Sequence, residues 1–163
     1  MRIYSLIDSQ TLMTKGFASE VMRSPEPPKR WDIAKKKGGV RTIYHPSSKV
    51  KLIQYWLMNN IFSKLPMHNA AYAFVKNRSI KSNALLHAES KNKYYVKIDL
   101  KDFFPSIKFS DFENAFTRYR DRIEFTTEYD KELLQLIKTI CFISDSTLPI
   151  GFPTSPIIAN FVA

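Results

Sequence analysis

The chain has 163 residues, of which 44% are hydrophobic and 25% charged, a composition typical of a globular domain with a core of its own. Its apolar runs are much shorter than the ~18 residues of a membrane span, and a signal-peptide pattern is absent, so we expect no membrane partner. With a single cysteine the chain cannot form an internal disulfide, which fits a cytoplasmic protein. Residues 1–98 hold 18 Lys and Arg against 5 Asp and Glu, whereas residues 99–163 hold 7 against 10; this favours nucleic-acid binding, with a surface charged only for solubility as the alternative.

Residues 1–30 are predicted to form an N-terminal helical extension. Residues 3–22 have a weak helical periodicity that is interrupted near Gly16, which indicates one or two short helices. The proline-rich residues 24–28 end any helix, because proline lacks the amide donor. The extension either packs on the core or docks a partner.

Residues 31–46 are predicted to form a β-hairpin with a turn at its two adjacent glycines. Four basic residues surround its tip: Lys35, Lys36, Lys37 and Arg41. Phosphates are natural ligands of such a group, since arginine binds them bidentately and lysine acts as a point charge. A hairpin with ordinary solvated lysines is the alternative.

The middle of the chain is predicted to contain a helix, a strand and a second helix. Ser47 and Ser48 supply the N-cap of a helix that continues to about residue 65. Residues 70–75 are strand-like and lead through a basic turn into a helix near residues 80–87. The three histidines lack metal-ligand spacing, which together with the single cysteine excludes a zinc site.

Residues 94–100 are predicted to form a buried strand, because Val96, Ile98 and Leu100 alternate with more polar side chains. Asp99 would then end a rigid strand while facing outward, a position suited to a hard divalent cation such as Mg2+. The alternative is an aspartate that merely precedes a turn.

Three further helices are predicted toward the end of the chain. The first has Ser110 or Asp111 as its N-cap, and the second covers about residues 128–143 with Cys141 as a buried thiol rather than a nucleophile. The third begins with Ser155 as N-cap and Pro156 at the first helical position.

Four motifs occur in an order that resembles bacterial reverse transcriptases, most closely those of retrons. They are the basic hairpin, Phe74-x-x-x-Arg78-Ser79, Asp99-Leu100-Lys101-Asp102-Phe103-Phe104-Pro105-Ser106 and Gly151-Phe152-Pro153-Thr154-Ser155-Pro156-x-x-Ala159-Asn160. The resemblance runs from about Trp31 to Ala163. It implies an α+β right-hand polymerase fold, with fingers in residues 31–90 and the first half of the palm in residues 91–163, while the thumb and the second half of the palm are missing.

The same resemblance implies roles for single residues near the reacting groups. Asp99 matches the first catalytic, metal-binding aspartate, and the backbone carbonyl of Leu100 matches the adjoining ligand of Mg2+. Phe104 matches the aromatic gate that crowds a 2′-hydroxyl and so favours deoxynucleotides. Lys35 and Arg41 resemble the finger residues that clamp the triphosphate of the incoming deoxynucleotide.

Further residues are implied to contact the substrates. Those that match the loop shaping the nucleotide pocket are Gly151, Pro153 and Ser155. Those implied to contact nucleic acid are Lys36, Lys37, Arg78 and Pro156. Bracing of the palm is the alternative role of Arg78, and Asp102 is interpreted as a turn or helix-capping residue.

The sequence departs from the family pattern in two places. Ile150 stands where many relatives have glutamine, and the Tyr-x-Asp-Asp turn that supplies the other catalytic aspartates is absent. One carboxylate cannot hold the two metal ions of phosphoryl transfer. We therefore expect that these 163 residues alone do not polymerise. A split enzyme with a second chain, a truncated gene product and a fragment that only binds are three explanations.

The missing half is expected to cover an exposed apolar side of the palm that includes Ile157, Ile158 and Phe161. The isolated chain should then aggregate or dimerise.

Two functions are compatible with these features. The first is a retron-type RNA-directed DNA polymerase, whose relatives copy part of a structured noncoding RNA into a branched RNA–DNA molecule and often serve in phage defence beside an effector protein. The second is a non-catalytic nucleic-acid-binding or assembly module derived from a polymerase. Asp99 with Phe104 favours the enzyme, and the missing aspartates favour the module.

Overall fold

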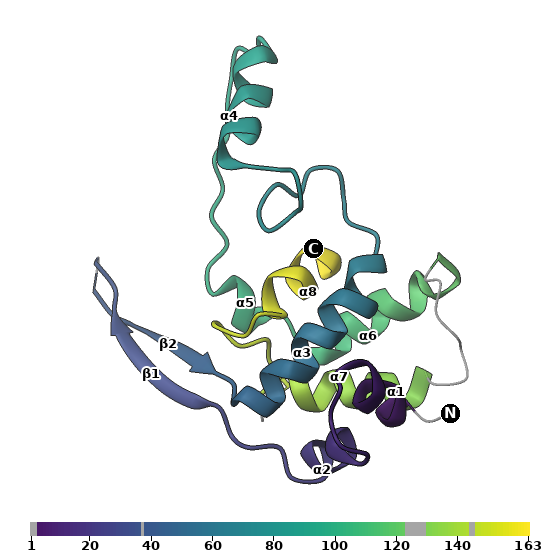
Figure 1. Ribbon diagram of the computed structural model, residues 1–163. Coiled ribbons are helices and arrows are strands. Elements are labelled where there is room, and N and C mark those ends of the chain that lie inside the picture. Colours follow the sequence, from purple (N-terminus) through teal and green to yellow (C-terminus); the bar gives the residue numbers. More distant parts are fainter. Residues whose placement is uncertain (1–2, 37, 123–129, 144–145) are drawn as a thin grey trace.

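The computed structural model describes residues 3–36, 38–122, 130–143 and 146–163, and it combines helices with one hairpin (Figure 1). The helices are α1 (Ile3–Gln10), α2 (Phe17–Arg23), α3 (Ser48–Asn60), η1 (Phe62–Lys64), α4 (Ile80–Glu89), α5 (Phe103–Ser106), α6 (Phe109–Arg118), η2 (Arg120–Arg122), α7 (Asp130–Cys141) and α8 (Ser155–Val162). The strands are β1 (Lys29–Ala34) and β2 (Val40–His45). This mixed content agrees with the predicted α+β class. In the ranges given above, none of the helices is long and apolar enough to cross a membrane.

Of the one or two short helices predicted for the N-terminal extension, the structure shows two, and they pack on the core. Ile3 and Ile7 of α1 and Val21 of α2 are buried in the same cluster as α3 and α7. Asp8 is also buried, and its carboxylate accepts hydrogen bonds from the backbone of Gly16 at 2.6 Å and of Ala18 at 2.7 Å. Because these amides begin α2, the carboxylate fixes one short helix on the other.

Aromatic side chains form the centre of the core, where α6 meets α8 and the end of α3. The ring of Phe112 lies 6.1 Å from Phe62, 6.4 Å from Phe142 and 5.7 Å from Phe161, measured between ring centroids. All four side chains are buried. Truncation of such a residue to alanine typically costs about 3–5 kcal/mol of folding free energy, so this cluster is a main source of stability.

The helix α7 carries the predicted apolar stripe and packs on α3. Gln54 of α3 is fully buried, and its side-chain amide donates to the Ile140 carbonyl at 2.7 Å. Cys141 is buried as predicted, and burial raises the pKa of its thiol to about 12. A neutral thiol in this setting is a packing group. The start of the helix predicted from about residue 128 lies outside the described residues.

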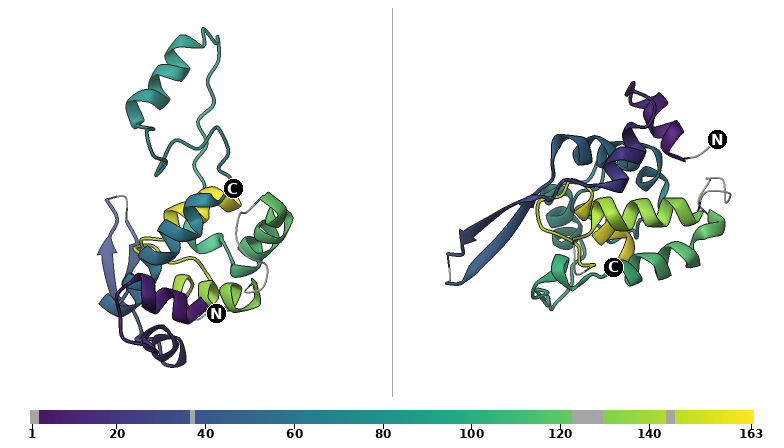
Figure 2. Two further views of the ribbon diagram at one scale, coloured as in Figure 1. Left: turned by 45° about the vertical axis from the view of Figure 1, so that its right-hand side comes forward. Right: turned by 90° about the horizontal axis from the view of Figure 1, so that it is seen from below.

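The hairpin projects from one side of the helical body (Figures 1 and 2). Its register places Ile33 opposite Arg41 and Lys29 opposite His45, and the turn contains Gly38 and Gly39 as predicted. Lys37, at the tip, lies outside the described residues. Within the rest of the hairpin, Thr42 donates to Asp32 at 2.7 Å, and this bond, together with Arg30, lowers the pKa of the Asp32 carboxyl.

Two predicted strands are wrong. Residues 94–100 run as an extended segment with exposed side chains, for example Val96 at 86% and Ile98 at 79% exposure. A strand needs a neighbour to satisfy its N–H and C=O groups, and in the described part of the chain the only sheet is the β1–β2 hairpin. Residues 70–75 form turns instead, because Phe74 adopts a left-handed conformation with φ +57°.

Two predicted helix starts are displaced by one or more residues. The N-cap position of α6 is Lys108, whose backbone N–H is bound by the Asp111 carboxylate at 2.8 Å. The N-cap position of α8 is Thr154, because the Ser155 hydroxyl instead donates to the Pro149 carbonyl at 2.6 Å. Pro156 lies in the first turn of α8.

The expectation that Ile157, Ile158 and Phe161 form an exposed apolar stripe is also wrong. Ile158 and Phe161 are buried and Ile157 is half-buried. They pack against α6, whose aromatic side chains occupy the surface assigned to a missing partner. The apolar side chains that are exposed belong mainly to α4 and residues 94–100, which extend away from the body (Figure 1).

Candidate active site

The segment 146–150 joins the parts of the chain that surround the site. On one side, Leu148 donates to the Ile107 carbonyl at 3.0 Å and Phe109 donates to the Ser146 carbonyl at 2.8 Å. On the other side, the backbone N–H of Tyr44 in β2 donates to the Ile150 carbonyl at 2.8 Å. These bonds hold the hairpin and the beginning of α6 against one segment, although they are far apart in sequence.

Gly151 permits this close approach of the hairpin. Its φ of +107° is accessible to glycine at little cost. A Cβ atom at this position would overlap the Tyr44 carbonyl oxygen and lie 2.7 Å from the Ile43 side chain. The base of the hairpin therefore fits against Gly151 only because that residue has no side chain.

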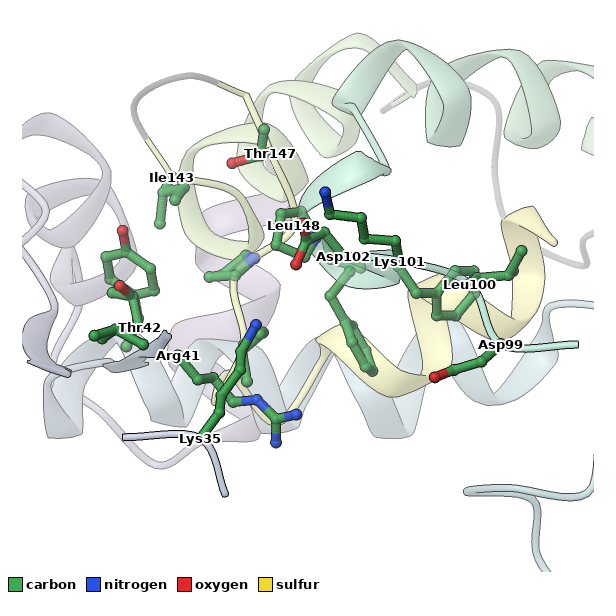
Figure 3. A pocket seen from close by; sticks show the side chains of 17 residues that line it. Lys35, Arg41, Thr42, Asp99, Leu100, Lys101, Asp102, Ile143, Thr147 and Leu148 are labelled. Carbon is green, nitrogen blue, oxygen red and sulfur yellow. The ribbon is translucent and has the colours of Figure 1, made fainter. Parts of the chain in front are cut away.

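A cavity of about 690 Å3 lies between the hairpin, residues 99–105 and the segment 146–150 (Figure 3). Five of the predicted site residues line it: Lys35, Arg41, Asp99, Leu100 and Phe104. This volume is in the range of small-molecule binding sites. The fold thus brings together residues from two segments about sixty positions apart.

The hairpin supplies two cations to the cavity. Arg41 in β2 lies opposite Ile33 in β1, and Lys35 comes two residues after Ile33. The side chains of Lys35 and Arg41 therefore extend from the same face of the hairpin. Figure 3 shows Lys35 and Arg41 on the hairpin side of the cavity, with Asp99 on the other side. An arginine and a lysine on one face can bind adjacent phosphate groups.

Asp99 and Leu100 provide two oxygen ligands of the kind that Mg2+ prefers, a carboxylate and a backbone carbonyl. Across the described ranges, no group of three or more His, Cys, Asp and Glu side chains forms a cluster able to hold a metal ion. The described residues thus offer at most part of a Mg2+ coordination shell. Nucleotide phosphates, water or further carboxylates must supply the remaining ligands.

Phe104 forms a half-buried wall of the cavity. It belongs to the one-turn helix α5, and its ring centroid lies 5.6 Å from that of Phe103 in an edge-to-face arrangement. Asp102 precedes α5 with φ +49° and also lines the cavity. The turn at Asp102 directs the chain from the extended segment into α5, which brings Phe104 into the lining of the same cavity as Asp99.

The other predicted site residues that the structure describes, Gly151, Pro153, Ser155, Pro156, Lys36 and Arg78, are outside the cavity lining, whereas Lys37 is not among the described residues. Gly151 supports the hairpin and Ser155 bonds within its own loop, as described above, and Pro153 is half-buried in that loop. Lys36 is exposed near the hairpin tip. Arg78 donates to the carbonyls of Asn69 and Ala71, so it braces its own loop rather than the segment 91–163.

The polar lining residues without a predicted role include Lys101, Thr42 and Thr147. Among the described residues, Lys101 raises the number of cations in the lining to three, against the carboxylates of Asp99 and Asp102. Its place two residues after Asp99 in the sequence is a signal that could have identified it. No local pattern marks Thr147, because it reaches the cavity only through the backbone bonds of segment 146–150.

The residues that line the cavity lie within a region that matches a known protein family. The family profile described as "Reverse transcriptase (RNA-dependent DNA polymerase)" matches residues 33–163. Retron Ec73 reverse transcriptase of Escherichia coli is 96% identical over the whole chain, which covers 52% of that protein. Retron Mx162 reverse transcriptase of Myxococcus xanthus is 36% identical over 80% of the chain and 28% of its own length. Retron Ec86 reverse transcriptase of Escherichia coli is 33% identical over 76% of the chain and 35% of its length. The chain thus spans about half or less of these relatives.

Proposed function

Since the chain belongs to the reverse transcriptase family and is similar to its retron members, we propose that it supplies the nucleotide-binding part of a retron-type RNA-directed DNA polymerase. The observation that supports this most strongly is the cavity in which Lys35 and Arg41 meet Asp99, Leu100 and Phe104. In this proposal residues 31–90 are fingers and residues 91–163 are the first half of a palm.

The cavity has the groups that an incoming deoxynucleoside triphosphate needs. Lys35 and Arg41 bind the phosphates and neutralise the charge that develops on them during transfer. Phe104 occupies the space that a 2′-hydroxyl would need, so a deoxyribose is accepted more readily than a ribose. Pro149 and Ile150 also line the cavity, and the Ile150 carbonyl holds the hairpin by accepting the hydrogen bond from the backbone of Tyr44.

Asp99 and the Leu100 carbonyl are the groups in this chain that would hold Mg2+. When bound, the metal supplies charge neutralisation at the phosphates and activation of the primer 3′-hydroxyl. Asp99 presents its carboxylate to the cavity from the exposed segment that precedes α5. The 163 residues contain no Tyr-x-Asp-Asp sequence, so the carboxylates needed for a second metal must come from elsewhere. These residues alone therefore bind nucleotide but do not polymerise.

The relatives also suggest the partners of the complete enzyme. All three are retron reverse transcriptases by name. By analogy, the template is a structured noncoding RNA, the product is DNA joined to that RNA, and a further polypeptide region completes the palm. A role in phage defence with an effector protein belongs to the same proposal.

Primer extension tests the proposed function. The 163-residue chain is compared with a polypeptide in which the remaining part of the retron Ec73 reverse transcriptase follows it. We expect deoxynucleotide incorporation with Mg2+ only by the longer polypeptide. There, Asp99→Asn abolishes extension, whereas Glu113→Gln, on the exposed side of α6 and outside the cavity lining, retains it. Extension by the Asp99→Asn variant would contradict the assigned role of this carboxylate.

A non-catalytic binding module is the second candidate, and the basic surplus of residues 1–98 supports it. It predicts salt-sensitive RNA binding without extension by either polypeptide. The two candidates therefore differ in the activity of the longer polypeptide, while RNA binding is common to both.

A further inference from the structure

The loop 69–78 between η1 and α4 is held by side-chain contacts although it has no regular secondary structure. The Arg78 guanidinium donates to the carbonyls of Asn69, at 2.6 Å, and Ala71 and stacks over the Tyr72 ring at 5.2 Å. From the other side, the Asn160 side chain of α8 donates to the Ala73 carbonyl at 2.7 Å. Figure 1 shows the loop beside the end of α8. The loop is thus fixed both internally and to the body.

These contacts hold Phe74 in an unusual position. Its φ is +57°, a left-handed conformation that is unfavourable for a bulky side chain, and its ring is 72% exposed. The Asn160 bond to Ala73 acts on the residue directly before it. A strained and exposed aromatic residue on a braced loop contributes little to the core, so its position calls for an external partner.

The charge around the loop indicates the chemistry of that partner. Residues 33–88 contain ten Lys and Arg and no Asp or Glu. Lys76 and Lys81 are exposed on either side of Arg78. An exposed aromatic ring in a basic, carboxylate-free segment matches single-stranded nucleic acid, where the ring stacks on a base and the cations bind the phosphates.

We infer that the loop 69–78 is a binding element for single-stranded RNA, in which Phe74 stacks on an unpaired base and Lys76 contacts the adjacent phosphate. Asn160 is a positioning residue, because it fixes the backbone that presents the ring. This inference extends the proposed function, from which the choice of RNA follows, by assigning a contact outside the nucleotide cavity.

The test measures binding of the 163-residue chain to an oligouridylate that carries one 2-aminopurine, without Mg2+ or nucleotide. Stacking on Phe74 quenches the fluorescence of the modified base. We expect Phe74→Ala to lower the affinity about tenfold and to remove the quenching, whereas Phe74→Trp retains both. The salt dependence of binding stays unchanged in Phe74→Ala, since no phosphate contact is lost, but its slope decreases by about 0.7 in Lys76→Ala.

Leu12→Ala is the matched control. Leu12 is also exposed, at 93%, and has a φ of +56°, but it lies in the N-terminal extension. The Leu12→Ala variant should bind RNA with the same affinity as the unmodified chain. Asn160→Ala should lose quenching without a change in salt slope. Equal affinities of Phe74→Ala and Leu12→Ala, or persistent quenching in Phe74→Ala, would overturn the inference and favour a protein surface as the partner of Phe74.

The outcome is independent of polymerase activity. The binding assay contains neither Mg2+ nor nucleotide, so its readout does not depend on occupation of the nucleotide cavity. Failure of primer extension would contradict the proposed function while leaving the Phe74 result intact. Failure of the Phe74 variants would overturn only the RNA contact.

Discussion

Replacement of Gly151 by alanine should release the hairpin from the body. The new methyl group would overlap the Tyr44 carbonyl oxygen, and the φ of +107° costs alanine about 1 kcal/mol relative to glycine. Relief of the overlap displaces β2 and breaks the Tyr44 N–H bond to Ile150, worth about another 1 kcal/mol. The sum of about 2 kcal/mol corresponds to a roughly thirtyfold shift toward the undocked hairpin.

Two measurements follow this shift. Amide hydrogen exchange at Tyr44 should accelerate about thirtyfold, and deoxynucleotide affinity should fall because Lys35 and Arg41 move with the hairpin. The free energy of global unfolding should change less, because release of the hairpin relieves the overlap without unfolding the body. Little buried surface is lost in this step, since β1 is exposed along its length. Gly16→Ala is the control, with φ +93° but nothing within 4 Å of the new methyl group. Equal nucleotide affinities and equal Tyr44 exchange in the two variants would refute the reasoning.

Three further predictions concern other parts of the chain. Asp8→Ala should lower the free energy of unfolding in urea by about 2 kcal/mol, because the amides of Gly16 and Ala18 lose their acceptor, whereas Asp8→Asn should lose less; equal losses would contradict this role. Cys141 should resist alkylation at pH 8 in the folded chain and react after unfolding, because its pKa of about 12 keeps the thiol neutral; since the unfolded thiol ionises at lower pH, stability should fall as pH rises above about 9, and rapid alkylation of the folded chain would be inconsistent with the burial. In the longer polypeptide, Phe104→Ala should raise ribonucleotide incorporation relative to deoxynucleotide by at least tenfold, and an unchanged ratio would exclude Phe104 as the gate.

Local signals were sufficient to predict most helices and the hairpin. Ser47 accepts a hydrogen bond from the backbone of Val50, as expected of an N-cap, and the adjacent glycines form the hairpin turn. The apolar stripe of α7 is buried as its spacing predicts. These features depend on residues within one or two turns of each other, so a short window of sequence contains the relevant physics.

The errors concern features that depend on distant parts of the chain. The alternation in residues 94–100 is favourable for a strand, yet pairing requires a second strand that the sequence window does not reveal. Likewise, the pattern of α8 indicates an apolar face but not that Phe112 of α6 covers it. Ser155 was predicted as the N-cap of α8, but its hydroxyl donates a hydrogen bond to the nearby Pro149 carbonyl instead.

Local patterns made Asp99, Lys35 and Arg41 candidates, and the family motifs added Phe104 and a specific role for each residue. The structure places all four around one cavity. The support that Gly151 gives to the hairpin depends on an approach of two backbones that are more than a hundred residues apart in the chain. Such a contact leaves no signal at either position except the glycine itself.

The most direct test of the nucleotide cavity is deoxynucleoside triphosphate binding to the 163-residue chain by equilibrium dialysis with Mg2+. The double variant Lys35→Ala/Arg41→Ala is compared with Lys15→Ala/Arg23→Ala, which removes the same charge from the N-terminal extension. We predict at least a tenfold loss of affinity in the first variant and less than a twofold loss in the second. Equal losses would show that binding follows net charge alone, and would contradict the assignment of this cavity to the incoming nucleotide.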